Sequence, residues 1–311
     1  MVPPGIEPGT HGFSVHCSTI LAKVPLALSG CKYRMIFNLY KTNIKKNQFV
    51  TSHSKMKRML LAIDIGNTRI KAAVFEQNTL LEVVVFSKEA LQEKMQSILN
   101  AHPTITDLMV ASVGEIGTKD FLAWDKTVKI HFVTHSSPFP FQNHYATPHT
   151  QGIDRMVLAA GAVLQFPQQN RLVIDAGTCI TYDFVDADDV YHGGAIAPGI
   201  RLRYESLHRY TANLPLLTLD SLRLGENNLA KVNLIGSSTK ESIHSGVVNG
   251  IVHEIDGFID AYRAKFSNFI IILTGGDTEF LAKRLKNTIF ANSNFLLESL
   301  NQTYQYKIKN D

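Results

Sequence analysis

The sequence predicts an α/β protein of two similar halves, each a sheet with helices, that face each other across a cleft. Short apolar runs with the length of buried strands alternate with helical segments. One run ends in Asp-Ile-Gly-Asn-Thr at residues 64–68, and a second ends in Asp-Ala-Gly-Thr at residues 175–178. Each is followed by two more strand-like runs, which is typical of a repeated structural unit.

The composition fits a folded protein of two domains. The chain has 311 residues, of which 45% are hydrophobic and 19% are charged. A sizeable core is therefore expected, and disorder over the whole chain is excluded. No apolar stretch of about 18 residues exists, so no membrane-spanning helix is expected. Three cysteines are too few for a disulfide framework, which favours a reducing, cytoplasmic location.

Residues 1–58 differ in composition from the remainder. They hold 9 Lys or Arg and 1 acid, whereas the other residues hold 22 basic and 26 acidic side chains. The mildly acidic body argues against nucleic-acid binding. Early Pro and Gly residues and aperiodic lysines predict an extension outside the fold that is disordered, artefactual or dispensable, and a targeting peptide is the alternative. Met56 and Met59 are both candidate starts.

The first half, residues 59–165, is predicted to hold five strands and two helices. The strands are apolar runs at residues 60–65, 70–75, 80–86, 108–113 and 128–133. The helices are expected at residues 88–100 and 153–164, and Leu91, Met95 and Ile98 share one face of the former. An irregular segment with aromatic residues is expected at 138–148.

The second half, residues 166–311, repeats the pattern. Its strands are expected at residues 172–176, 180–185, 190–196 and 269–273. Helices are expected at residues 201–210 and 241–264, and another begins near Thr278.

The two Asp-x-Gly turns are candidate phosphate sites. Glycine lets the backbone approach a ligand, and exposed N–H groups with Asn67 and Thr68 can donate to phosphate oxygens. Asp64 offers the carboxylate that Mg²⁺ prefers, and Lys71 follows on the next strand. An ordinary hairpin explains one such turn equally well. Two of them facing each other would hold the phosphates of a nucleotide from both sides.

Two further segments carry candidate chemistry. Gly275-Gly276 joins a strand to a helix, where the backbone can lie flat against a ring and the helix start favours an anion. In Gly-Ile-Asp-Arg at residues 152–155, Asp154 can accept a hydroxyl proton and Arg155 can bind a carboxylate. The alternative for this pair is an acid at a helix start beside a solvated arginine.

Taken in order, these motifs resemble those of type III pantothenate kinases, within the superfamily of actin, sugar kinases and heat-shock ATPases. The resemblance runs from about residue 59 to the C-terminus and rests on residues 64–71, 152–155, 175–178, 193–199, 211–215 and 274–276. It implies two actin-like (ribonuclease H-like) domains with a nucleotide cleft between them.

The resemblance also implies roles for individual residues. Asp154 matches the catalytic proton acceptor, and Asp175 matches the ligand of a monovalent cation, K⁺ or NH₄⁺. The matches for ATP contacts are Asp64, Ile65, Gly66, Asn67, Thr68, Arg69, Ile70, Lys71, Thr178, Gly275 and Gly276. The matches for pantothenate contacts are Tyr145, Gly152, Ile153, Asp154, Arg155 and Thr239, with Ser237 and Ser238 as neighbouring alternatives to Thr239.

The expected function is ATP-dependent phosphorylation of pantothenate to 4′-phosphopantothenate, the first step of coenzyme A biosynthesis. The resemblance implies Mg²⁺ with ATP and a homodimer with pantothenate near the interface. No nucleic-acid or membrane partner is expected. Two alternatives remain open: a sugar or amino-sugar kinase of the same superfamily, and a non-catalytic regulator on the same fold.

Overall fold

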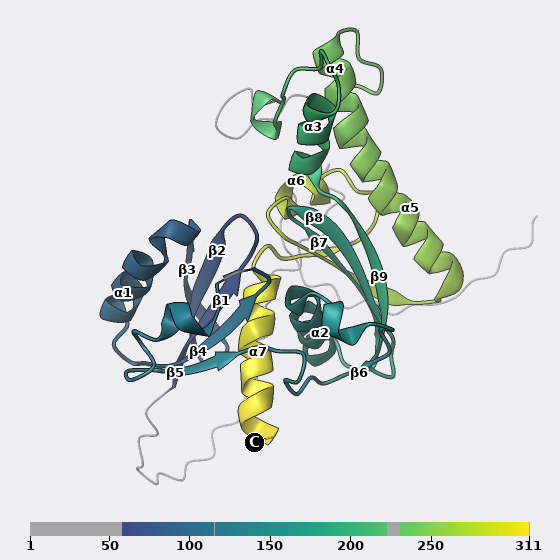
Figure 1. Ribbon diagram of the computed structural model, residues 1–311. Coiled ribbons are helices and arrows are strands. Elements are labelled where there is room, and N and C mark those ends of the chain that lie inside the picture. The colour runs from purple at the N-terminus through teal and green to yellow at the C-terminus, as the bar shows by residue number, and fades with distance from the viewer. Residues whose placement is uncertain (1–57, 115, 223–230, 311) are drawn as a thin grey trace, which may run out of the picture. The chain divides into compact units, whose positions relative to one another are not determined.

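The computed structural model describes residues 58–114, 116–222 and 231–310 (Figure 1). The predicted N-terminal extension, apart from Arg58, lies outside the described residues. Within the described ranges, none of the helices has the length and apolar character needed to cross a membrane.

The first sheet is built from the first half of the chain. Its strands are β1 (Met59–Ile65), β2 (Ile70–Glu76), β3 (Thr79–Phe86), β4 (Ile105–Ser112) and β5 (Lys129–Phe132). They lie in the order β3-β2-β1-β4-β5, antiparallel among the first three and parallel from β1 through β4 to β5. The central β1 is apolar at every position except Asp64, because both of its faces are covered.

The second sheet repeats this order with strands from the second half. Its strands are β7 (Asn170–Ala176), β8 (Cys179–Val185), β9 (Val190–Pro198), β10 (Phe269–Thr274) and β11 (Phe290–Ala291), extended by β6 (Gln142–Asn143) beside β9. The order β9-β8-β7-β10-β11 matches the first sheet strand for strand, with the same pattern of antiparallel and parallel pairs. This repeat confirms the predicted fold class of two similar α/β halves.

The helices occupy corresponding places in the two halves. They are α1 (Leu91–Ala101), α2 (Ile153–Gln165), α3 (Ile200–Arg209), α4 (Thr239–His244), α5 (Gly250–Lys265), α6 (Thr278–Ala282) and α7 (Phe295–Asn310). A π-helical segment, Ser245–Asn249, joins α4 to α5. α2 follows the last strand of the first sheet, and α7 follows the last strand of the second. They are therefore the equivalent helices of the repeat.

α2 and α7 pack against each other and against both sheets. One hydrophobic cluster joins Leu60 of β1, Val157 of α2 and Leu300 of α7. Another joins Leu158 of α2 to Val173 of β7. At Gly161 of α2 an added Cβ would lie 1.9 Å from the Oγ of Ser299 on α7, so only glycine permits this close approach.

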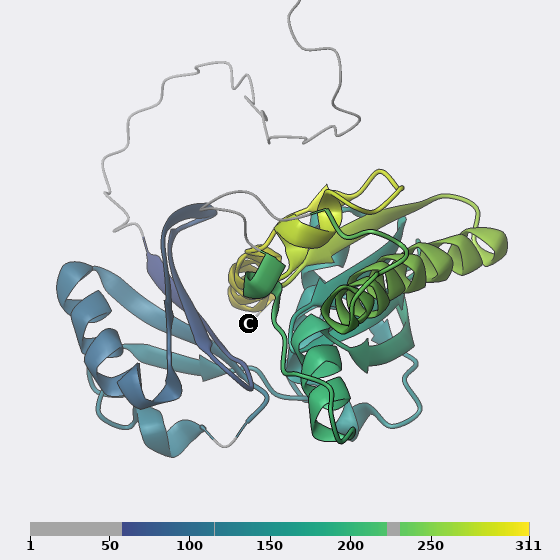
Figure 2. The same ribbon diagram turned by 90° about the horizontal axis from the view of Figure 1, so that it is seen from above.

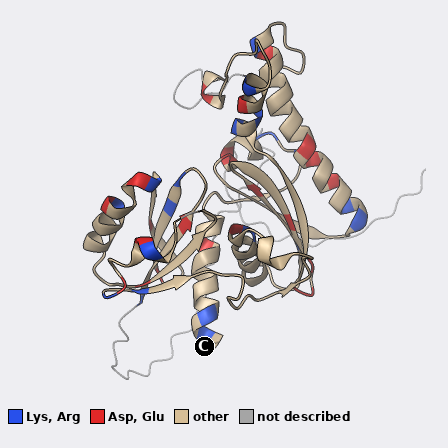
Figure 3. Cartoon of the chain, in the orientation of Figure 1, with Lys and Arg blue, Asp and Glu red and all other residues tan. Residues whose placement is uncertain are grey.

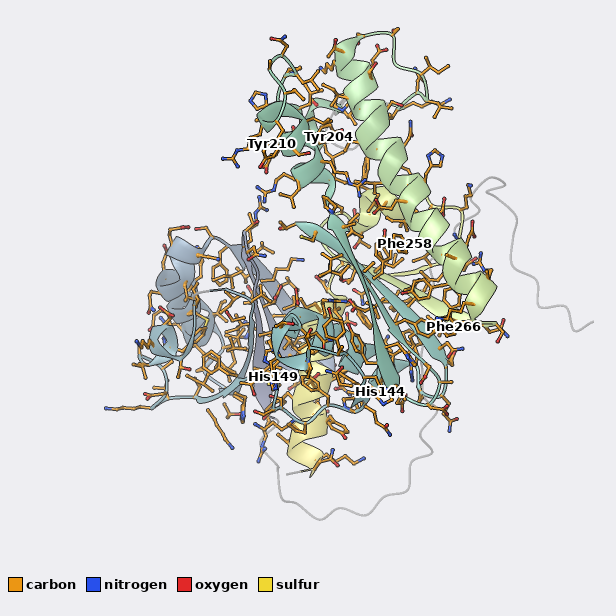
Figure 4. The ribbon with its side chains drawn as sticks, turned by 45° about the vertical axis from the view of Figure 1, so that its right-hand side comes forward. His144, His149, Tyr204, Tyr210, Phe258 and Phe266 are labelled. Atoms are coloured by element: carbon orange, nitrogen blue, oxygen red, sulfur yellow. The ribbon has the colours of Figure 1, made fainter. Side chains whose placement is uncertain are left out.

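The other face of the second sheet is covered by α5, which runs along it (Figure 2). Phe258 stacks on Tyr182 of β8 with ring centroids 4.2 Å apart, and Phe266 stacks on Phe184 at 4.1 Å. Figure 4 shows Phe258 on the side of α5 that faces the strands, and Phe266 follows directly after the end of the helix. These aromatic contacts fix the strand that leads away from the second Asp-x-Gly turn.

Most predicted elements are confirmed to within a few residues. α7 and the two-residue strands β6 and β11 were not predicted from the sequence. The signal for α7 was present, since Leu296, Leu300, Tyr304 and Ile308 recur every four residues. β6 lies inside the segment expected to be irregular. The predicted domain boundary at residues 165/166 stays a prediction.

Candidate active site

The first Asp-x-Gly turn closes the β1–β2 hairpin. Asp64, near the end of β1, lies directly opposite Lys71 of β2. The Gly66 N–H donates to the Arg69 carbonyl across 3.1 Å, which leaves Asn67 and Thr68 exposed at the tip of the turn. The sheet therefore presents a carboxylate, an ammonium group and the polar turn side chains at one end of β1.

The second turn lies at the corresponding end of β7. Asp175 pairs with Thr181 of β8, and the Gly177 N–H donates to the Cys179 carbonyl across 2.9 Å. The Thr178 hydroxyl lies 3.4 Å from the hydroxyl of Thr68 in the first turn. The structure thus brings together two turns that lie 110 residues apart in the sequence.

The glycine pair packs onto the second turn. Gly275 has φ +98°, and an added Cβ would lie 2.3 Å from the Ala176 carbonyl oxygen and 2.5 Å from Oδ1 of Asp175. Both the left-handed backbone and the close approach require glycine here. The Asp277 N–H donates to the Ala176 carbonyl across 3.0 Å. An added Cβ at Gly276 meets nothing within 4 Å, so that residue leaves open space for a ligand.

Three carboxylates from distant segments interact electrostatically around these turns. Burial among protein atoms raises the pKa of Asp64 to about 7, and the charges of Asp154 and Asp175 add to the shift. Burial and the charge of Asp154 likewise raise the pKa of Asp175 to about 7. Lys71 opposes both shifts. Burial also raises the pKa of Asp154.

This set of oxygen donors fits a hard cation that also binds phosphate. Asp64 and Asp175 are half-buried, and their negative charges repel each other unless a cation lies near them. Among residues 58–114, 116–222 and 231–310, no three His, Cys, Asp or Glu side chains lie close enough to hold a metal ion. A cation at this place would therefore share its coordination with phosphate and water, as Mg²⁺ commonly does.

The predicted substrate segment begins α2. Gly152 precedes the helix, and Oδ1 of Asp154 accepts a hydrogen bond of 2.8 Å from the Arg155 N–H. Arg155 is 4% exposed. Its Nε donates to Oδ1 of Asp183 across 2.9 Å, and its guanidinium lies 5.6 Å from the ring centre of Tyr145. The structure thus places Tyr145, Asp154 and Arg155 in one group.

Comparison with known proteins assigns the chain to a family. The model of the type III pantothenate kinase family matches residues 60–261. A type III pantothenate kinase of Flavobacterium johnsoniae is 66% identical over 253 residues, which cover 81% of this chain and 100% of that protein. The chain belongs to the type III pantothenate kinase family. A type III pantothenate kinase of Flavobacterium psychrophilum is 60% identical over 249 residues, covering 80% of this chain and 100% of that protein.

A solved structure has a fold similar to that of this chain. A crystal structure from Campylobacter jejuni, named for the Baf family of transcriptional activators, superposes with a TM-score of 0.52 at 19% identity. The superposition covers 80% of this chain and 99% of that chain. At this identity the likeness concerns the fold alone. Family membership confirms the resemblance that the ordered motifs indicated.

Several predicted site residues can reach a ligand only through their backbone. The side chains of Ile65 and Ile70 are fully buried in the core of the first sheet, and that of Ile153 is 8% exposed.

Thr239 begins α4 and is exposed. Within the described part of the chain, no hydrogen bond or ring contact joins Thr239 to Tyr145 or Asp154.

The residues that hold Arg155 were not among those predicted from the sequence. Asp183 is fully buried on β8, and its Oδ1 also accepts a hydrogen bond of 2.5 Å from the Tyr191 hydroxyl of β9. Burial by itself lowers the pKa of Arg155, but the Asp183 charge outweighs it and the net shift is upward. The available signal was an acid inside the apolar run Ile-Thr-Tyr-Asp-Phe-Val. The alternative of a solvated arginine is wrong, because the guanidinium is buried.

Proposed function

We propose that this chain transfers the γ-phosphoryl group of ATP to the 4′-hydroxyl of pantothenate, the first step of coenzyme A biosynthesis. The observation that carries the proposal is the meeting of the two turns, where the hydroxyls of Thr68 and Thr178 lie 3.4 Å apart. The charge of Asp154 acts on both turn carboxylates, Asp64 and Asp175. In that arrangement a group that can accept a proton lies beside two turns suited to phosphate. Family membership supplies the identity of the acceptor.

ATP is held by the two turns and the glycine pair. The N–H groups and side chains of residues 64–71 and Thr178 donate to phosphate oxygens, and Lys71 offsets their charge. Gly275 and Gly276 give the nucleotide a flat backbone surface beside the second turn. Mg²⁺ bound with ATP would neutralise charge on the phosphates, and Asp64 is the residue placed to hold it.

Pantothenate binds at the start of α2. Tyr145 and residues 152–155 form its site, and Asp154 takes the proton of the attacking hydroxyl. The raised pKa of Asp154 makes the carboxylate a better base than a fully solvated aspartate. The Arg155 guanidinium attracts the pantothenate carboxylate, although its Nε edge is already bonded to Asp183.

Three finer features belong to this proposal. Asp175 binds a monovalent cation, K⁺ or NH₄⁺, that offsets its charge. The protein acts as a cytoplasmic homodimer. Since Thr239 has no described contact with the group around Asp154, we place its pantothenate contact in the site of the second copy.

The test is a phosphate-transfer assay of the full chain with ATP, pantothenate and a panel of sugars and amino sugars. We expect formation of 4′-phosphopantothenate and no sugar phosphate. Transfer to a sugar but not to pantothenate would overturn the proposal. Sedimentation of the same preparation measures the oligomeric state, and a monomer that is fully active would exclude the shared site.

A further inference from the structure

An arginine outside every motif reaches the place where the two turns meet. Arg201 is the second residue of α3. Its Nη2 donates to the Thr68 hydroxyl across 3.3 Å, and that hydroxyl lies 3.4 Å from the hydroxyl of Thr178. The guanidinium is thus within hydrogen-bonding distance of a group proposed to hold phosphate.

Backbone packing fixes the start of α3 against the second turn. The Gly199 N–H donates to the Thr178 carbonyl across 3.0 Å. A Cβ at Gly199 would lie 2.2 Å from the Gly177 carbonyl oxygen and 2.5 Å from that of Thr178, so the two segments touch through their backbones. Arg201, two residues further on, therefore keeps its place beside the turn and extends toward Thr68.

The guanidinium is available for a ligand. Its ion pair with Glu205, at 3.2 Å, joins side chains that are 53% and 43% exposed, and such surface pairs are weak. Arg203 differs, because Glu254 binds it at 2.6 Å and the Pro198 carbonyl accepts from its Nε. Figure 3 shows the basic positions along α3 in blue.

The charge at the site favours a second cationic side chain. Asp64, Asp154 and Asp175 interact with one another, and Lys71 is the cation that acts on both Asp64 and Asp175. The phosphates of ATP add further negative charge. In phosphoryl transfer this charge spreads over the equatorial oxygens of the moving group, and a positioned arginine stabilises it.

We propose that Arg201 is a catalytic residue that binds the γ-phosphoryl group of ATP during transfer. This inference rests on the proposed function. The bond between the γ-phosphorus and the bridging oxygen of ADP breaks, and a bond from that phosphorus to the acceptor oxygen forms. The hydroxyl proton passes to Asp154. Arg201 donates hydrogen bonds to the γ-phosphoryl oxygens during the transfer.

The first experiment compares Arg201→Ala with Arg209→Ala in the full chain. Arg209 is the exposed last residue of the same helix and lies outside the site, so it is the matched control. We expect kcat to fall about 10²-fold or more in Arg201→Ala and to stay unchanged in Arg209→Ala. A fall of less than about threefold in Arg201→Ala would overturn the proposal. Its side chain is more than half exposed, so the variant is expected to fold.

The second experiment measures nucleotide binding and does not depend on turnover. Arg201→Ala should bind a non-hydrolysable ATP analogue about tenfold more weakly than wild type, as expected for one lost hydrogen bond to a charged group. Its affinity for ADP should be unchanged, because ADP lacks the γ-phosphate. Equal weakening of both nucleotides, or no weakening of either, would contradict a contact with the γ-phosphate.

Chemical rescue separates a missing guanidinium from a distorted site. Millimolar guanidinium or methylguanidinium should restore part of the kcat of Arg201→Ala, whereas NaCl at equal ionic strength should not. Equal effects of both salts would overturn the proposal. If wild type does not phosphorylate pantothenate, the proposed function fails, while the comparison of the ATP analogue with ADP still decides the role of Arg201.

Discussion

The two halves have the same strand order, but they differ in the residue that lies opposite the turn carboxylate on the neighbouring strand. In the first sheet Asp64 lies opposite Lys71. In the second sheet Asp175 lies at the equivalent position, opposite Thr181. One carboxylate thus has an ammonium group as its direct neighbour, and the other has a hydroxyl.

This difference indicates that the two turns have different roles in binding the nucleotide. The first turn combines negative and positive groups, as a phosphate site with a bound divalent cation needs. The second turn has no cationic side chain across the strand, and Gly275 packs against it instead. We therefore expect the second turn to depend on an added cation and the first to depend on Lys71.

The largest expected effect concerns the helices that follow each sheet. α2 has Asp154 in its first turn, close to both turn carboxylates, whereas α7 has Glu298, which accepts a hydrogen bond of 2.9 Å from Asn292. Asp154→Asn removes the basic oxygen and keeps the shape, so kcat should fall about 10²–10⁴-fold while the KM for ATP changes little. Steady-state kinetics measure both parameters.

Glu298→Gln is the matched control in the equivalent helix. It should leave kcat unchanged, because Glu298 lies outside the proposed site. If Asp154→Asn is folded and its kcat stays within about threefold of wild type, Asp154 has no role as a base.

The next prediction concerns Lys71 and Thr181, the residues that lie opposite the two turn carboxylates. Lys71→Thr gives the first half the residue found at the equivalent place in the second half. It should lower kcat about 10²–10³-fold and raise the KM for ATP, because a positive group that faces the phosphates is lost. Equal kinetics in the variant and wild type would show that the difference between the halves has no functional role.

A smaller effect is expected where the equivalent helices α2 and α7 touch. Gly161→Ala places a methyl group against Ser299 and should lower the free energy of unfolding by about 1–3 kcal/mol, as measured by chemical denaturation. Ser299→Gly in the same chain should restore part of the loss. Gly257→Ala is the control, since a Cβ there meets nothing within 4 Å and its free energy of unfolding should not fall.

The smallest expected effect is the response to monovalent cations. Activity should rise severalfold when Na⁺ is replaced by K⁺ or NH₄⁺ at constant ionic strength, because a cation offsets the charge of Asp175. Thr181→Lys should weaken this response by placing an ammonium group where the first half has Lys71. Equal wild-type rates in all three salts would leave Asp175 without a cation role.

The local elements and the family could be predicted from the order of the amino acids. Apolar runs bounded by turn residues predicted β1, β2, β7 and β8, because strand and turn preferences depend on neighbouring residues. The similarity of the two Asp-x-Gly turns and their flanking runs predicted the repeat, which the matching strand orders confirm. The ordered motifs were sufficient for the family because each consists of a few adjacent residues.

The contacts among these residues could be identified only once the chain's three-dimensional fold was known. Asp64, Asp154 and Asp175 come from three separate elements, and their pKa shifts depend on burial that no local pattern reveals. The pairing of Arg155 with Asp183 and the approach of Arg201 to Thr68 join residues 28 and 133 positions apart. Such contacts follow from strand order and helix packing, which are set by the burial of the whole chain and not by the spacing of neighbouring residues.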